Sequence, residues 1–158
     1  MNRVVTSEQL ISILENVQEA MVPTMAKAMR RAVPLVKGQA KKNCTPGHSP
    51  YAKAPYTDDD DPRREPPHMR DVMFGKVIVE GNVVRGIVGN TKRYSPWVHD
   101  GTSKMAPRPF ILDAIKEHEQ DIIDIFNEEI ETTILQNVEG NLWGSTPSEF
   151  SGEEEEVE

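Results

Sequence analysis

The last third of the chain carries an apolar pattern that is long for a protein of this size. From residue 109 to 138, apolar side chains recur every three or four positions, the spacing of one helix face. An unbroken helix over this range would be about 45 Å long at about 1.5 Å per residue. The 158 residues suit one domain, so we expect part of this helix to pack on a neighbouring molecule. The stripe consists of Ile111, Ala114, Ile115, His118, Ile122, Ile125, Phe126, Ile130, Ile134 and Val138.

Two more helical patterns open the chain. Thr6 begins a capping box, and the apolar residues after it predict a helix over 7–21. Pro23 either ends this helix or opens a second one at its first turn. The second pattern covers 24–42. Pro34 lies inside it and predicts a kink, because proline lacks the backbone donor that the helix needs.

A long irregular segment separates these helices from the rest of the chain. Residues 43–68 contain six prolines and four consecutive aspartates, so we predict a long Pro/Asp-rich loop. Two runs rich in valine and isoleucine follow at 72–79 and 83–89, with the turn Glu80-Gly81-Asn82 between them, and predict an antiparallel hairpin. Residues 94–99 predict a short third strand at the sheet edge, because Pro96 cannot donate to a central ladder.

These elements define an α+β fold. It consists of N-terminal helices, a small antiparallel sheet made of the hairpin plus a short third strand, and a long C-terminal helix. We expect residues 1–139 to form a single α+β domain and residues 140–158 to form a flexible acidic C-terminal tail. Trp143 and Phe150 leave open the alternative that the tail docks on a partner.

Charge is divided unevenly along the chain. Residues 1–55 hold 8 Lys/Arg and 3 Asp/Glu, a net +5, whereas residues 56–158 hold 10 and 23, a net −13. The basic face of the second helix could contact DNA phosphates. Pairing with the acidic last helix, in the same subunit or the next, explains both charge patterns more simply. Glu8 and Glu15 interrupt the first apolar residues, which argues against a signal peptide. No run approaches the roughly 18 apolar residues of a membrane span, so we expect no membrane partner.

Residues with catalytic or metal-binding chemistry are sparse. Cys44 is the only cysteine, and we interpret it as an incidental thiol. The four histidines lack metal-ligand spacing, and the acidic run 58–61 lacks the glycine and terminal glutamate of a calcium loop. His99 and Asp100 are adjacent, whereas a catalytic triad converges from separate elements. The sequence therefore predicts no enzyme, no cofactor and no metal.

The segment from Tyr94 to Leu112 is the most informative motif. It reads YSPWVHDGT, then KM, then RPFI, with Ala114 following. Its glycine permits a left-handed turn, and the threonine hydroxyl after it can cap that turn. Its last two prolines fix the approach to the C-terminal helix, and we expect its tryptophan and phenylalanine to anchor the segment, the phenylalanine against the sheet. The residues we single out are Tyr94, Trp97, Val98, Gly101, Thr102, Pro107, Arg108, Pro109 and Phe110.

This motif resembles the tail-component and head–tail joining family of long-tailed bacteriophages. Members carry a Tyr-Ala-x-x-Val-Glu-x-Gly-Thr pattern, and a Pro-Phe-Leu-x-x-Ala pattern then opens the C-terminal helix. The order of helix, proline-containing loop, hairpin and helix extends the resemblance over about residues 7–135. Three features depart from the family pattern: His99 stands where an acidic residue is usual, the loop at 43–68 is longer and more acidic, and the last helix and tail extend further.

The resemblance implies a structural virion protein of the neck or tail, made in the host cytoplasm. Such a subunit would form a homo-oligomeric ring, sixfold or a multiple, that joins head to tail or completes the tail. Its partners would be further copies of itself, other neck, connector or tail-tube proteins, and genome DNA passing non-specifically through the channel. Two alternatives stay open: an assembly chaperone absent from the mature virion, and a small metal-dependent hydrolase that uses residues 58–61 and His99.

Overall fold

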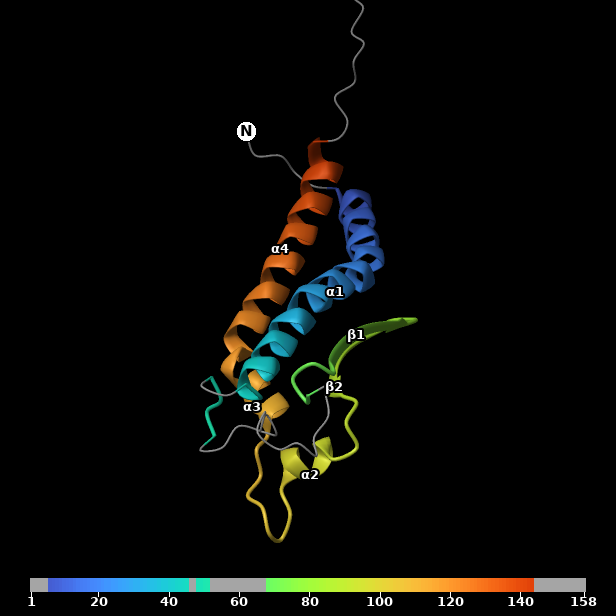
Figure 1. The fold of residues 1–158 in the computed structure, drawn as a ribbon. Coiled ribbons are helices and arrows are strands. Elements are labelled where there is room, and N and C mark those ends of the chain that lie inside the picture. The colour runs from blue at the N-terminus through green and yellow to red at the C-terminus, as the bar shows by residue number, and fades with distance from the viewer. Residues whose placement is uncertain (1–5, 46–47, 52–67, 144–158) are drawn as a thin grey trace, which may run out of the picture.

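The computed structural model describes residues 6–45, 48–51 and 68–143, and the side chains of 141–143 are not described. The α+β class is confirmed. Figure 1 shows α1 in the middle, with α4 on one side and the β1–β2 hairpin on the other. Most of the predicted loop at 43–68, and the tail after residue 143, lie outside the described residues. The elements are α1 (Ser7–Asn43), β1 (Met73–Glu80), β2 (Val83–Asn90), α2 (Ser95–Asp100), α3 (Phe110–Glu117) and α4 (Glu119–Trp143).

The two predicted N-terminal helices are one helix. The capping box is confirmed, since the Gln9 backbone N–H donates to Thr6 Oγ1 at 3.3 Å and the Thr6 N–H donates to Gln9 Oε1 at 3.1 Å. Pro23 and Pro34 both lie inside α1, so the predicted interruption at Pro23 is wrong. Proline removes one backbone donor and bends a helix without ending it. The bend of α1 is visible in Figure 1.

The predicted hairpin is confirmed to within one residue at each strand. β1 and β2 pair antiparallel, and the turn between the paired residues Glu80 and Val83 has two residues. Glycine at two inner positions lets the hairpin lie directly on α1. A Cβ on Gly75 would come within 2.7 Å of Val33, and one on Gly86 within 2.4 Å of the Met29 sulfur. Within the described residues the sheet has these two strands alone, so both edges stay unpaired.

The predicted third strand is wrong, because this segment forms the short helix α2. Pro96 lies in the first turn of α2, where a missing N–H costs nothing. Buried Ser95 and Val98 are three residues apart, which is helical spacing. The sequence pattern did not distinguish an edge strand from a helix start, since proline is tolerated in both.

The long C-terminal helix is divided at His118 into α3 and α4. The predicted long C-terminal helix is therefore confirmed with one break, although no proline or glycine lies at this position. His118 Nδ1 lies 2.6 Å from a carboxylate oxygen of Asp121. The break separates a short helix at the end of α1 from a long one that runs along α1, and both helices pack against α1.

The contact between α1 and α4 joins small side chains to a cluster of opposite charges. Alanines at the interface allow close approach, and two of them, Ala28 and Ala32, are at most 3% exposed. Glu129 is 5% exposed and lies 2.7 Å from both Lys27 Nζ and Arg31 Nη1. The predicted pairing of the basic face with the acidic last helix is thus confirmed, within one subunit.

The largest buried cluster lies at the C-terminal end of α1. Phe110, which opens α3, is fully buried there beside Val98 of α2. Three segments far apart in sequence therefore meet at one point, which sets the direction in which α2 and α3 leave the core. The cluster is Val36, Ala40, Cys44, Met69, Met73, Val98, Phe110 and Ala114.

The Glu129 ion pairs make the stability of the fold depend on pH. Hydrogen bonds from Lys27 and then Arg31 lower the pKa of Glu129 below its ordinary value of 4.5. A lowered carboxyl pKa stabilises the folded state above the ordinary value, and this contribution disappears as pH falls through the folded pKa. We expect Glu129→Gln to unfold at lower urea concentration than the wild type at pH 7, with the difference shrinking between pH 5 and pH 3.

Glu128→Gln is the matched control, because its side chain is 63% exposed and, among the described residues, pairs with Arg31. It should lower the urea midpoint less than Glu129→Gln does. An equal loss in both variants, or a Glu129→Gln loss that stays constant down to pH 3, would contradict this account.

Candidate assembly interface

The elbow, residues 94–112, is a braced turn between α2 and α3. Gly101 has φ +79° and ψ 179°, a conformation that side chains rarely adopt. The backbone of Thr102 exchanges two hydrogen bonds with Met105, at 2.9 and 3.2 Å. The Lys104 N–H donates to the Thr102 hydroxyl at 3.3 Å, which confirms the predicted cap. The Arg108 N–H donates to the Val98 carbonyl at 3.0 Å and closes the loop onto α2.

Phe110 and Val98 hold the elbow to the core. They are 0% and 1% exposed. The Phe110 ring meets the edge of the His99 ring, with centroids 5.3 Å apart. Phe110 packs in the cluster at the end of α1, and this cluster also contains Met73 of β1. Trp97 is 62% exposed, so the prediction that it anchors the elbow is wrong within the subunit.

The remaining motif residues have backbone roles. Tyr94 is the N-cap residue of α2 and packs half-buried beside the core. A Cβ on Gly101 would come within 2.8 Å of the Pro107 nitrogen, so glycine is required for this crossing. The Pro109 carbonyl accepts the Asp113 N–H at 2.8 Å and starts α3.

Sequence reasoning missed the polar residues that fix α3 to α1. Asn43 is 1% exposed, and its side-chain amide donates to the Phe110 carbonyl at 3.1 Å. Gln39 donates to Glu117 at 2.7 Å. Tyr51 donates its hydroxyl to Asp113 at 2.7 Å, and burial, with the carboxylate second, raises the pKa of Tyr51. The position of Asn43, three residues after Ala40 on the apolar stripe, was the available signal.

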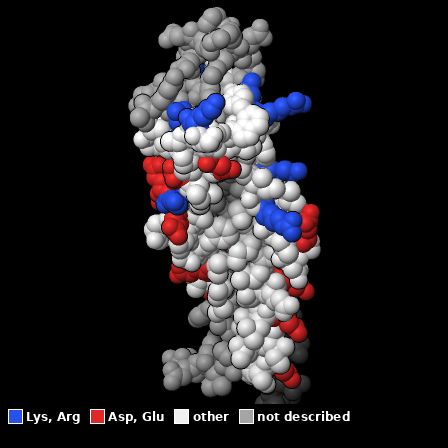
Figure 2. All heavy atoms as spheres, turned by 90° about the horizontal axis from the view of Figure 1, so that it is seen from below, with Lys and Arg blue, Asp and Glu red and all other residues white. Residues whose placement is uncertain are grey.

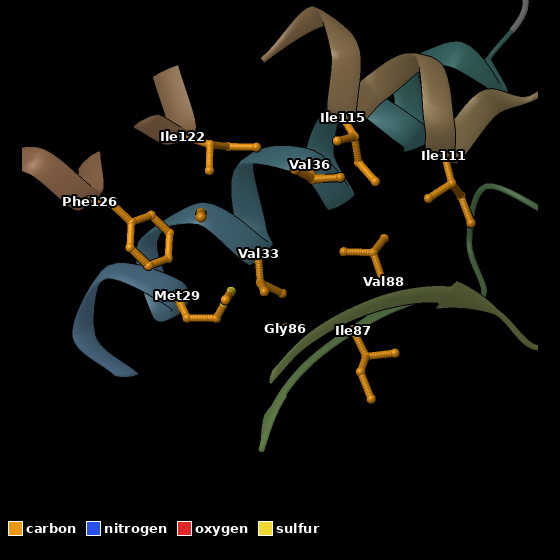
Figure 3. A pocket seen from close by; sticks show the side chains of 11 residues that line it. Met29, Val33, Val36, Gly86, Ile87, Val88, Ile111, Ile115, Ile122 and Phe126 are labelled. Atoms are coloured by element: carbon orange, nitrogen blue, oxygen red, sulfur yellow. The ribbon is translucent and has the colours of Figure 1, made fainter. Parts of the chain in front are cut away.

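An apolar groove lies beside the elbow. α1 forms its floor, β2 one wall, and α3 with the start of α4 the other. Its volume is about 390 Å³. Figure 3 shows Ile87 pointing to the opposite side of β2, whereas its neighbour Val88 lies on the groove side. A polar small molecule would find no orienting side chain in this lining, which is Met29, Ala32, Val33, Val36, Gly86, Ile87, Val88, Ile111, Ile115, Ile122 and Phe126.

Large apolar side chains remain exposed on several elements. They lie on the first turns of α1, on the hairpin and on α4. On the face in Figure 2, uncharged side chains cover a broad central region, acidic ones lie along its sides, and basic ones gather toward one end. Such surfaces mark contacts between proteins more often than solvent faces. The most exposed are Leu10, Ile11, Leu14, Val79, Val83, Trp97, Ile123 and Leu135.

The described residues provide little catalytic or metal-binding chemistry. Cys44 is fully buried, and desolvation raises the pKa of its thiol to about 12, so it is a poor nucleophile. His99 Nδ1 lies 2.7 Å from the Asp100 carboxylate. Across residues 6–45, 48–51 and 68–143, no three His, Cys, Asp or Glu side chains group to hold a metal. The acidic run 58–61 lies outside the described residues.

Comparisons with known proteins leave the chain without an assigned relative. No family model matches it, and searches of curated proteins and of solved structures likewise find no match. None of the described helices has the length and apolar character needed to cross a membrane.

Gly101, the one glycine of the elbow, should tolerate substitution poorly. Its backbone conformation alone costs a non-glycine residue about 1–3 kcal/mol, and an added Cβ would also press on Pro107 and Met105. We expect Gly101→Ala to lower the free energy of unfolding by at least this amount. Gly81→Ala is the control, since Gly81 also has positive φ but open space around it. Equal losses in urea denaturation would contradict the role of the crossing.

Proposed function

We propose that this protein is a structural assembly subunit of a long-tailed bacteriophage. It forms a homo-oligomeric ring, sixfold or a multiple, that joins the head to the tail or completes the tail. Its other partners are neck, connector or tail-tube proteins, and it resides in the virion after synthesis in the host cytoplasm. Genome DNA passes through the channel without specific contacts, because the net charge of −8 disfavours binding to phosphates.

The observation that carries this proposal is the incomplete hairpin. A two-stranded sheet is marginal on its own, and here α1 covers one face only. The outer face exposes Phe74, Val83 and Ile87 to solvent by 37–49%, and both edges keep unpaired backbone groups. Natural proteins blunt such edges or cover them, because an unpaired edge is a ready site for pairing with another chain. A subunit completed by its neighbours satisfies this requirement.

The elbow supports the same proposal from a different direction. Ring closure needs a constant angle between the surfaces that meet, because a heterologous contact closes only at the right rotation. Three backbone hydrogen bonds and a fully buried phenylalanine fix the chain between α2 and α3. The motif that carries the family resemblance is therefore a rigid part of the subunit, with conformational rather than catalytic residues.

The two alternatives receive no comparable support. The hydrolase would need residues 58–61, which lie outside the described part, and His99, whose ring contacts Asp100 and Phe110. An assembly chaperone could use the same surfaces as a ring subunit, but it would leave before the virion is complete. Mass spectrometry of purified virions distinguishes it, because a chaperone is missing from mature particles.

The purified full-length protein should form closed rings. Native mass spectrometry and negative-stain electron microscopy should show one dominant species of six subunits or a multiple. Higher protein concentration should increase the ring fraction at the expense of monomer. A monomer at every concentration, together with absence of the protein from purified virions, would end the proposal.

A further inference from the structure

The outer face of the hairpin combines apolar and basic side chains. Cross-strand partners point to the same face, and the inner face is fixed by Gly75 and Gly86 against α1. The alternate positions therefore face outward. The Phe74 ring lies across Gly89 on this side, since a Cβ there would come within 2.6 Å of it. The outer face comprises Phe74, Lys76, Ile78, Val83, Arg85 and Ile87, with Glu80 at its end.

The outer face of α4 has the complementary charge. α4 contains no lysine or arginine. Its inner side uses Glu129 for the ion pairs with α1, whereas Asp124 and Glu131 are exposed and lie seven residues apart, on the side turned away from α1. Leu135, 50% exposed, continues the same side one turn later. Glu131 forms no ion pair with any residue that the structure describes.

These two faces lie on opposite sides of the molecule. In Figure 1, α4 and the hairpin flank α1, so one copy cannot bring its own two faces together. A contact between different patches on two copies is heterologous, and repetition of such a contact produces a ring when the rotation closes. The layers would then repeat as sheet, α1, α4, and the sheet of the next copy.

We infer that the outer hairpin face docks on the outer face of α4 in a neighbouring copy. Lys76 and Arg85 then face Asp124 and Glu131 of that copy, and the hairpin apolar side chains pack around its Leu135. This inference rests on the proposed ring and identifies the surfaces that form it. Charge complementarity favours a second copy over nucleic acid, because the occupant of a basic apolar face must be acidic and offer apolar side chains of its own.

The dimensions of the two faces agree. An eight-residue strand is about 26 Å long, and the 25 residues of α4 span about 37 Å, so the hairpin fits along the helix. Lys76 and Arg85 are diagonal neighbours, about 8 Å apart at their Cα atoms. Asp124 and Glu131 are about 10.5 Å apart along the helix. Flexible lysine and arginine side chains bridge this difference.

Charge reversal tests the inference directly. In the full-length protein, Lys76→Glu/Arg85→Glu and Asp124→Lys/Glu131→Lys should each raise the subunit dissociation constant at least about tenfold, because like charges then face each other. Analytical ultracentrifugation and native mass spectrometry measure this change. Glu15→Lys/Glu19→Lys is the matched control for the α4 reversal, with the same charge change on exposed residues of α1, and should assemble like the wild type.

Mixing the two reversed proteins provides the decisive measurement. The reversed hairpin of the first variant complements only the reversed α4 of the second, and the native hairpin of the second complements the native α4 of the first. An equimolar mixture should therefore recover rings with a 1:1 composition and an even number of subunits. The quadruple variant should also assemble alone. Recovery also excludes misfolding as the cause of the separate defects.

The outcomes separate this inference from the proposed function. If the wild type forms rings and the reversals do not weaken them, the inference is overturned and the ring stands. If the wild type stays monomeric at every concentration, the inference fails, and the proposed function fails with it when the protein is also absent from purified virions. Should a reversed protein unfold by circular dichroism, the neutral variants Lys76→Gln/Arg85→Gln and Asp124→Asn/Glu131→Gln replace it, and unchanged assembly in them overturns the inference. A reconstruction with α4 lining the channel would also overturn it.

Discussion

Close packing on two sides of α1 is the constraint on which the rest of the structure depends. Alanines on one side admit α4, and glycines in the hairpin admit β1 and β2 on the other. Both contacts are close-packed, so larger side chains in place of these alanines and glycines would not fit. The C-terminal end of α1 then becomes the site where α2, α3 and the chain around Met69 converge. The position of α1 therefore determines where the other elements lie.

Local sequence signals predicted those parts of the fold that depend on local interactions. The capping box at Thr6, the hairpin with its turn at Gly81, and the positive φ of Gly101 each follow from the chemistry of adjacent residues. The errors arose where tertiary contacts decide. Pro96 is compatible with an edge strand or a first helical turn, and burial of Val98 selects the helix. The break at His118 has no proline or glycine to announce it.

The candidate site was predictable in part for the same reason. Phe110 is recognisable in the sequence because it follows two prolines at the start of an apolar helical pattern. Gly101 is recognisable because glycine is the residue that most readily adopts the positive φ of a turn. The exposure of Trp97 could not be predicted from the sequence, because it depends on which other parts of the chain pack over this residue. Asn43 and Tyr51 form contacts across more than 60 residues of sequence, so the spacing along one helix does not identify their partners, although the place of Asn43 on the apolar stripe of α1 indicates its burial.

The acidic character of α4 serves two sides of the helix in different ways. Glu129 is buried and its charge is neutralised inside the subunit, so it contributes to cohesion. The outward acids keep their charge, and this charge gives the subunit a polarity across its layers. Buried ion pairs gain specificity from geometry, whereas exposed charges act over about 8–10 Å at physiological salt. One helix thus combines an internal role with an external one.

The ion pairs between α1 and α4 also have a mechanical consequence. Lys27 and Arg31 meet Glu128 and Glu129, and Thr24 meets Thr133 with 2.8 Å between their hydroxyl oxygens, so the polar contacts lie within a short stretch of each helix. Sliding one helix along the other by a single turn, about 5.4 Å, would break all of them at once. The helix pair is thereby locked in axial register. The two helices therefore resist a force along their axes as one rigid unit.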